Sequence, residues 1–430
     1  MPPQDDSPLP GSPDCRQLST SRAALTRAGY SFSVFRHRNF LFVWASTRLV
    51  TMGTQMEMVV MGWFVLTLTD SPFLVGAISA ARMSLNILAL FAGAIADRVP
   101  KQRVLATVEF LMAAFAGVMI LLILSGVLET WHIFLLAMTT GMVRVFEMPS
   151  SQALVADTLP QDRIANGAAF NTLGRNIAML IGPLVGGVLF KSFGPGGAFI
   201  AIAALYMLSG WVALYVRSSG GAVGRTSESV ARSVIGGLRY VKGQQVLWAT
   251  LVLVLIFESS GWTFHTTLVP IFARNELNAD SGGLGLLLFA FGAGAVSASL
   301  VWAMIGSGRP VGRYMIGSVI VWHASILVFA TSQSFYVSMA ILVVTGVGFA
   351  STQFFMLSAL LGNSLSEYRG RVMSLRSLAI YAFALGSMSS GAMADFWSPP
   401  LAAVVVGTMG IVLALLLAVL APKLRRLQAS

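Results

Sequence analysis

Three carboxylic acids interrupt long apolar runs of this chain and could carry protons. Glu57, Glu147 and Glu258 each lie inside a run of mostly apolar residues. A charge at the centre of a hydrocarbon layer costs about 3 kcal/mol on insertion scales, so such acids are functional candidates. A carboxylate in a low-dielectric cavity can take up and release a proton near neutral pH. We therefore expect at least one of the three to move protons.

Arg144 and Glu147 form the most informative pair of opposite charges within one apolar run. The two residues lie one helical turn apart and can pair on one helix face. Pro149 follows them and predicts a kink. Two interpretations stay open. The pair either takes part in coupling proton transfer to transport, or it is a buried ion pair that holds its helix to a neighbouring helix.

Further polar side chains are expected to line the same cavity. Gln55 lies two residues before Glu57, and Arg175 is expected to pair with an acid of the first or fourth apolar run. Arg48 lies nine residues before Glu57, on the opposite face of a helix, so we do not expect these two to pair. His265 suits protonation near neutral pH, and a hydrogen-bonded structural histidine is the alternative.

Other charged residues within the apolar runs are Arg82, Glu109 and Arg376. For Glu109 and Arg376 we expect structural contacts and no direct part in transport chemistry.

No sequence pattern indicates an enzyme. The chain has no G-x-x-x-x-G-K-[ST] phosphate loop, no metal-ligand spacing of His and Cys, and no nucleophile with an adjacent base. Its single cysteine, Cys15, lies in the polar N-terminal stretch, which excludes a disulfide framework. We expect no enzymatic activity, no cofactor and no bound metal.

The composition is that of a membrane protein. Of the 430 residues, 56% are hydrophobic and only 10% are charged, whereas soluble domains carry about 25% charged residues. The formal net charge of +11 is spread over short loops, which argues against nucleic acid as a partner. We therefore expect an all-α integral membrane protein whose surroundings are the lipid bilayer.

The apolar residues form repeated runs long enough to cross a membrane, which takes about 20 residues. Twelve runs are predicted, and they cover residues 40–68, 73–96, 104–127, 131–155, 166–190, 196–216, 247–272, 283–305, 314–331, 335–361, 372–396 and 400–420.

The widest gap between runs divides the chain into two six-helix halves, at 39–216 and 247–421. The loop between them, 217–246, contains apolar residues at helical spacing from Glu228 onward, which predicts an amphipathic helix at the membrane surface. This helix is either a tether between the halves or a plain linker. Residues 1–38 and 422–430 are expected to be cytoplasmic tails, the first of them disordered.

Basic residues predict the orientation. Most of the 28 Lys and Arg residues fall in the tails and in loops on one side, whereas Lys191 and Arg274 fall on the other. Because loops rich in Lys and Arg stay in the cytoplasm, both termini are predicted to be cytoplasmic. We expect a multi-pass protein of a bacterial inner membrane.

A charged loop between the second and third runs has a recognisable pattern. It reads Gly93-Ala-Ile-Ala-Asp97-Arg98-Val-Pro-Lys101-Gln-Arg103. The pattern G-x-x-x-D-R-x-x-K-x-R in this position resembles the signature loop of the major facilitator superfamily of transporters. The resemblance implies a cytoplasmic gate, in which Asp97 contacts Arg371 or Arg376, and Arg98 and Arg103 pair with acids such as Asp157.

Two further motifs resemble those of exporters in this superfamily. The fifth run contains Gly182-Pro183-Leu-Val-Gly186-Gly187, which is similar to the exporter motif of that helix; ordinary packing of small residues is the alternative. Arg144 with Glu147 resembles the fourth-helix motif of proton-coupled drug exporters. Over residues 33–420 the chain resembles the branch that includes bacterial enterobactin and macrolide exporters.

The sequence and these resemblances together predict a secondary active transporter of the twelve-helix major facilitator fold. We expect a monomeric proton-coupled antiporter that exports an amphipathic small molecule, a drug-like compound or a siderophore, by alternating access. The alternatives are a proton-coupled importer of a nutrient or metabolite, a lipid flippase, and a signalling or assembly protein that does not transport.

Overall fold

The computed structural model describes residues 33–84, 99–160, 163–217, 230–305 and 310–428, and within these ranges it contains helices and no strand. Nine stretches of the described residues are helices long and apolar enough to cross a membrane. The predicted all-α membrane fold is therefore confirmed, although the count of twelve spans is not reproduced as such.

The first apolar runs form a compact set of helices. These are α2 (Arg38–Thr69), α3 (Pro72–Ser84), α5 (Lys101–Ser125), α6 (Thr130–Arg144), α7 (Glu147–Asp157) and α8 (Ile164–Leu214). The break between α6 and α7 lies at Val145 and Phe146, where in a continuous helix the ring of Pro149 would clash with the carbonyl group four residues before it. The kink predicted beside Pro149 is confirmed.

Helix α8 contains both the fifth and the sixth predicted runs. Gly194 lies between them with φ 69° and ψ −176°, a backbone conformation that residues with a side chain rarely adopt, and Pro195 follows. The chain turns at this glycine, which divides α8 into two helices.

The remaining apolar runs form a second set. Its members are α10 (Gln245–Ile256), η4 (Phe257–Trp262), η5 (Phe264–Leu268), α11 (Val269–Asn275), α12 (Ser281–Ile305), α13 (Val311–Ala330), α14 (Phe335–Gly362), α15 (Arg369–Leu378), α16 (Ile380–Phe396), α17 (Pro399–Leu420) and α18 (Pro422–Arg425). Elements η4 and η5 are π-helical. Such wide turns are rare and often lie at functional sites.

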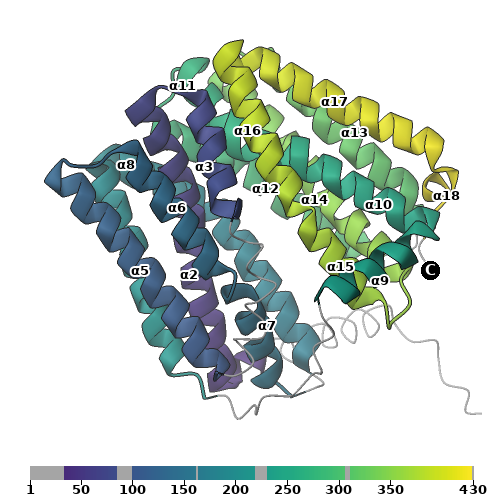
Figure 1. The fold of residues 1–430 in the computed structure, drawn as a ribbon, viewed down its shortest axis with the longest axis horizontal. Coiled ribbons are helices and arrows are strands. Elements are labelled where there is room, and N and C mark those ends of the chain that lie inside the picture. Colours follow the sequence, from purple (N-terminus) through teal and green to yellow (C-terminus); the bar gives the residue numbers. More distant parts are fainter. Residues whose placement is uncertain (1–32, 85–98, 161–162, 218–229, 306–309, 429–430) are drawn as a thin grey trace, which may run out of the picture.

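The helices pack as two groups, residues 38–214 and residues 245–420 (Figure 1). Within the first group α2 and α5 pack on α8, and α3 packs on α6. Within the second, α14 packs on α12 and α13, and α13 packs on α17. Between the groups, α3 lies along α16 and α8 lies along α12. Gly76 and Gly187 allow this approach, since their Cα atoms face the backbone carbonyl groups of Ser387 and Ser281.

Contacts between the groups gather toward one end of the molecule. Arg274 donates to the carbonyl oxygen of Leu66 and pairs with Asp70. Lys191 Nζ lies 2.8 Å from Asp280 Oδ2. We call this the clasped end; the two groups diverge toward the opposite end, where α7 and α9 lie (Figure 1).

Helix α9 (Val230–Lys242) lies in the loop between the groups and belongs to the second by its contacts. Tyr240 stacks on Tyr368 with ring centroids 4.1 Å apart, and the Tyr240 hydroxyl accepts a hydrogen bond from the Leu365 amide.

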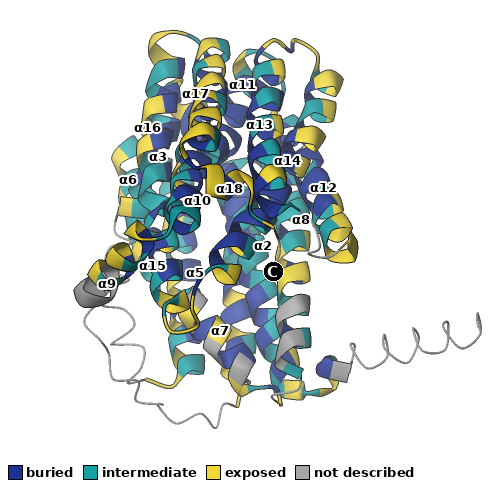
Figure 2. Cartoon of the chain, turned by 90° about the vertical axis from the view of Figure 1, so that its right-hand side faces the viewer, coloured by how far each residue is buried: buried dark blue, intermediate teal, exposed yellow. Residues whose placement is uncertain are grey.

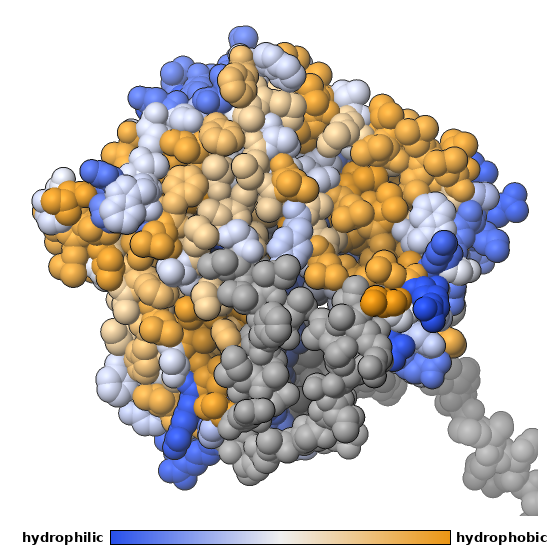
Figure 3. Space-filling view, in the orientation of Figure 1, coloured by the Kyte–Doolittle hydropathy of each residue, from blue (hydrophilic) through white to orange (hydrophobic). Residues whose placement is uncertain are grey.

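The outer faces of the long helices are apolar. Exposed side chains include Leu121 and Leu124 of α5, Phe396 of α16 and Val419 of α17. Figure 3 shows hydrophobic side chains over most of this face, with hydrophilic ones toward its edges, and Figure 2 shows the exposed residues along the outside of the helices. Helices that are apolar inside and outside suit a lipid environment.

Candidate functional site

Glu57 is the centre of a buried polar cluster formed by three helices. This residue lies on α2 and is 3% exposed. Arg82 Nη1, on α3, lies 3.4 Å from Glu57 Oε1, and the Tyr206 hydroxyl, on α8, donates to Glu57 Oε2 at 2.5 Å. The Thr54 hydroxyl lies 3.5 Å from the Tyr206 oxygen. The cluster therefore connects α2, α3 and α8 through one titratable group.

Small residues bring these helices together. Gly53 lies against the ring of Tyr206, where an added Cβ would be 2.8 Å from the ring. Gly141 of α6 lies against the carbonyl group of Arg82, which sets α3 close to α6. The positions of Arg82 and Tyr206 around Glu57 thus depend on close helix packing.

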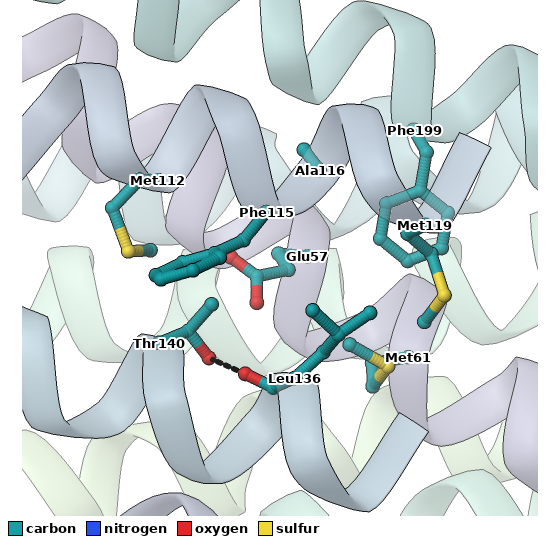
Figure 4. A pocket seen from close by; sticks show the side chains of 9 residues that line it. All are labelled: Glu57, Met61, Met112, Phe115, Ala116, Met119, Leu136, Thr140 and Phe199. Atoms are coloured by element: carbon teal, nitrogen blue, oxygen red, sulfur yellow. Dashed lines mark hydrogen bonds between the residues drawn. The ribbon is translucent and has the colours of Figure 1, made fainter. Parts of the chain in front are cut away.

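A small apolar cavity of about 10 Å³ adjoins the Glu57 carboxyl group. It has room for about one water molecule. Its other lining residues are Met61, Met112, Phe115, Ala116, Met119, Leu136, Thr140 and Phe199. The carboxyl group points into the space that these side chains surround (Figure 4).

Arg144 and Glu147 form the ion pair that their spacing predicts. Arg144 Nε lies 3.5 Å from Glu147 Oε2, across the break between α6 and α7. Arg144 also interacts electrostatically with Glu57. The pair is therefore adjacent to the Glu57 cluster.

Glu109 makes the structural contacts that we expected. It is fully buried, and the Ser46 hydroxyl donates to its carboxylate at 3.0 Å. The Ser209 hydroxyl donates to the Ser46 carbonyl oxygen at 2.7 Å, which joins α2, α5 and α8.

The expected ion pair of Arg175 with an acid is wrong for the described residues. Glu57 pairs with Arg82 and Glu147 pairs with Arg144, so neither acid is left for Arg175. Arg48 does not pair with Glu57, as its helix face predicts. Its guanidinium group instead donates to Asn171, to the carbonyl oxygen at 2.8 Å and to Oδ1 at 2.6 Å.

The glycines of the fifth run lie at helix contacts. Gly182 faces Gln55, and Gly186 faces Met56, both on α2. Gly187 faces α12 of the other group, and the carbonyl group of the buried Pro183 lies next to Gly285 of that helix. Gln55 is thus half-buried against α8, and the motif sets the distances of α8 from both neighbours.

Glu258 lies on the π-helical segment η4, half-buried and near Arg376 of α15. The two charges interact, and Arg376 Nη2 donates to Gln353 Oε1 at 2.9 Å. Of the two interpretations of His265, on η5, its surroundings favour the structural one. It is 3% exposed and stacks on Phe291 with centroids 3.9 Å apart, so it belongs to the packed interior and does not line an open cavity.

The predicted gating loop is only partly described. Gly93, Asp97 and Arg98 lie outside the described residues. Lys101 Nζ lies 2.8 Å from Asp157 Oδ2, whereas the resemblance assigned Asp157 to Arg98 and Arg103. Arg103 is exposed.

Sequence reasoning missed Tyr206 and the ion pairs of the clasped end. The only sequence feature that could have pointed to Tyr206 is a hydroxyl group within an apolar run, and such hydroxyl groups are too common to be informative. Asp70 and Arg274 are 204 residues apart, and nothing in their local sequences indicates that they meet.

Comparisons with known proteins agree with this fold. A family model described as transmembrane secretion effector matches residues 29–430. The chain is 23% identical over 270 residues to the staphyloferrin A transporter of Staphylococcus aureus, covering 60% of this chain and 66% of that protein. It is 29% identical over 192 residues to the multidrug resistance protein MdtG of Enterobacter lignolyticus, covering 44% of each. The chain thus matches just under two thirds of the first relative and under half of the second.

Solved structures share the fold. The peptide transporter POT in complex with sulfate has a TM-score of 0.72 at 14% identity, covering 91% of this chain and 96% of that one. The nucleoside transporter NupG has a TM-score of 0.69 at 13% identity, covering 89% and 98%. Since the family model covers nearly the whole chain, the protein is a multi-pass membrane protein of the transmembrane secretion effector family of the major facilitator superfamily, whose members are transporters and not enzymes.

Proposed function

We propose that the protein is a monomeric proton-coupled antiporter of a bacterial inner membrane, with both termini in the cytoplasm, that exports an amphipathic small molecule. The observation that carries this proposal is the buried carboxylate of Glu57 between Arg82 and Tyr206. Relatives named as a multidrug resistance protein and as a staphyloferrin A transporter support a small-molecule substrate.

Alternating access would use the two groups of helices, taken as the halves 39–216 and 247–421. The clasped end carries the contacts of α3 with α16 and of α8 with α12. On the proposed orientation the clasped end faces away from the cytoplasm, and the conformation is open toward the cytoplasm. Opening to the other side would then require the Asp70–Arg274 and Lys191–Asp280 pairs to separate.

Protonation of Glu57 could couple proton binding to the change between the two conformations. The charged carboxylate attracts Arg82, but Arg82 Nη1 makes no hydrogen bond within the described part of the chain. Adding a proton would remove the attraction and free α3 from α2. Because α3 also forms the contact with α16, the proton would bias the equilibrium between the two conformations.

Everted membrane vesicles with an energised pH gradient and a pH-sensitive dye test this proposal. Cationic drugs, macrolides, siderophores and sugars are added in turn to vesicles with wild-type protein, Glu57→Gln or Glu367→Gln. Glu367 is an exposed acid near the start of α15 and serves as the matched control. We expect a transported compound to dissipate the gradient with wild type and Glu367→Gln and not with Glu57→Gln.

Substrate counterflow without a gradient checks that the Glu57→Gln variant is folded and still exchanges substrate. Equal dissipation by Glu57→Gln would remove Glu57 from the coupling step. If no compound dissipates the gradient while the protein is folded and abundant, antiport itself is refuted.

A further inference from the structure

Three arginines within the helices share one property: none of them forms an ion pair with an acid in the described ranges. They are Arg48 of α2, Arg175 of α8 and Arg376 of α15. Each lies within its membrane helix and not at a loop, and each has access to solvent, since Arg175 is exposed and the other two are half-buried. Guanidinium groups at this depth are costly and require a reason.

Arg48 and Arg175 lie side by side. The aliphatic part and the head of Arg48 lie against Gly174, the residue before Arg175, and Asn171 holds the Arg48 guanidinium group. Arg48 Nε is buried and lacks a hydrogen-bond partner among the described residues. The charges of Arg48 and Arg175 repel each other. Within the described ranges, Asn171 thus satisfies the two terminal nitrogens of Arg48 and leaves its buried Nε without a partner.

Arg376 approaches the same region from the other group of helices. It lies on α15, before the break that separates α15 from α16, and its Nη2 donates to Gln353 Oε1 of α14 at 2.9 Å. Its charge repels that of Arg175. Arg376 of the second group of helices therefore lies within electrostatic range of Arg175 of the first.

The acids nearby do not neutralise this arginine group. Glu147 interacts with Arg48 but is already paired with Arg144. Glu258 interacts with Arg376 without forming an ion pair of 4.0 Å or less. Among the described residues, Glu258 is therefore the one acid near the three guanidinium groups that has no ion pair of its own, so the described charges of this group sum to a positive value.

We infer that the arginine group formed by Arg48, Arg175 and Arg376 binds an anionic group, a carboxylate or a phosphate, of the transported molecule. The planar guanidinium group suits both, because it can donate two parallel hydrogen bonds to either. An anion between the helix groups would also relieve the repulsion of Arg175 and Arg376. The inference rests on the proposed transport function and narrows its substrate class to organic anions, away from lipophilic cations.

Equilibrium binding of two dyes with the same xanthene core tests the inference. Carboxyfluorescein is anionic and rhodamine 6G is cationic, and their fluorescence anisotropy is measured with the purified full-length protein at fixed ionic strength. No pH gradient is present, so a failure of proton coupling does not affect the result. The variants are Arg175→Gln, Arg376→Gln and Arg175→Lys, with Arg313→Gln on the exposed start of α13 as the control.

We expect carboxyfluorescein to bind more tightly than rhodamine 6G. Its affinity should fall roughly 10- to 100-fold in Arg175→Gln and Arg376→Gln, the range for loss of a charge-assisted hydrogen bond, less in Arg175→Lys, and not in Arg313→Gln. Because removing one of three like charges relieves repulsion, the melting temperature of Arg175→Gln should not fall below that of wild type. Tighter binding of the cationic dye, unchanged affinity in both glutamine variants, or binding of neither dye would overturn the inference.

Discussion

Gly76 of α3 lies in close contact with α16. We therefore predict that adding a methyl group there, in Gly76→Ala, shifts the equilibrium between the two conformations. A Cβ atom at position 76 would overlap the carbonyl oxygen of Ser387 and lie 2.9 Å from its carbonyl carbon. These are backbone atoms and cannot rotate away. In Gly76→Ala, α3 and α16 must therefore move apart at the clasped end.

The size of the effect follows from the cost of overpacking. Inserting a methyl group into a packed contact costs about 1–3 kcal/mol. If the conformation open at the clasped end lacks this contact, the ratio of the two conformations changes by roughly 5- to 150-fold. Gly117→Ala of α5 is the matched control, since nothing lies within 4 Å of a Cβ there and the gain in helix propensity is the same.

Distances between spin labels at Leu68 and Phe396 provide the measurement. Both side chains are exposed, at the ends of α2 and α16. Cys15, the single native cysteine, is first replaced by serine. We expect the longer-distance population to grow in Gly76→Ala and to match wild type in Gly117→Ala. An unchanged distance distribution in Gly76→Ala would refute the reasoning, because the contact would then absorb a methyl group without moving.

Three further predictions concern single residues. In Tyr206→Phe, loss of the hydrogen bond to Glu57 should cost about 1.5–3 kcal/mol, measured as a lower melting temperature in detergent with counterflow retained. The hydrogen bond from Lys191, and then the amide of Gly283, hold the pKa of Asp280 below its usual value. Because the pKa is lowered in the closed form, the charged Asp280 stabilises closure of the clasped end at pH values above its ordinary pKa of about 4, and this stabilisation is lost as the pH falls below about 4. The spin-label distances should therefore lengthen as the pH is lowered through this range. In Asp280→Asn, the distances should no longer depend on pH in this range. Gly194→Ala should destabilise the protein by about 1–3 kcal/mol through backbone strain alone, because its φ is positive and nothing lies within 4 Å of a Cβ; an unchanged melting temperature would contradict this.

Local features of the protein were predictable from its sequence. The apolar runs predict membrane helices because crossing the hydrocarbon depends on the length and hydropathy of one continuous segment. The break before Pro149 was also predictable from the local sequence, since a proline ring clashes with a carbonyl group only four residues before it. The pair of Arg144 and Glu147 was also predictable, because the helix itself brings residues three apart together.

Other features were not predictable because they depend on which helices become neighbours. Glu57 stood out as an acid in an apolar run, but its partners lie on α3 and α8, and Tyr206 is 149 residues away. The assignment of Arg175 to an acid was wrong for this reason: the nearest helices offered acids that were already paired. The π-helical turns of η4 and η5 and the burial of His265 likewise follow from packing.

The sequence by itself determined that the chain spans a membrane with many helices, which acids are candidates for carrying protons, and which superfamily it resembles. These properties depend on hydropathy, spacing and motifs within short segments. Only the tertiary structure decided that Glu57 meets Arg82 and Tyr206, that the charges of Arg175 and Arg376 interact from two groups of helices, and that the groups are clasped at one end. Such contacts join residues far apart in the chain, so their energies depend on the helix packing as a whole.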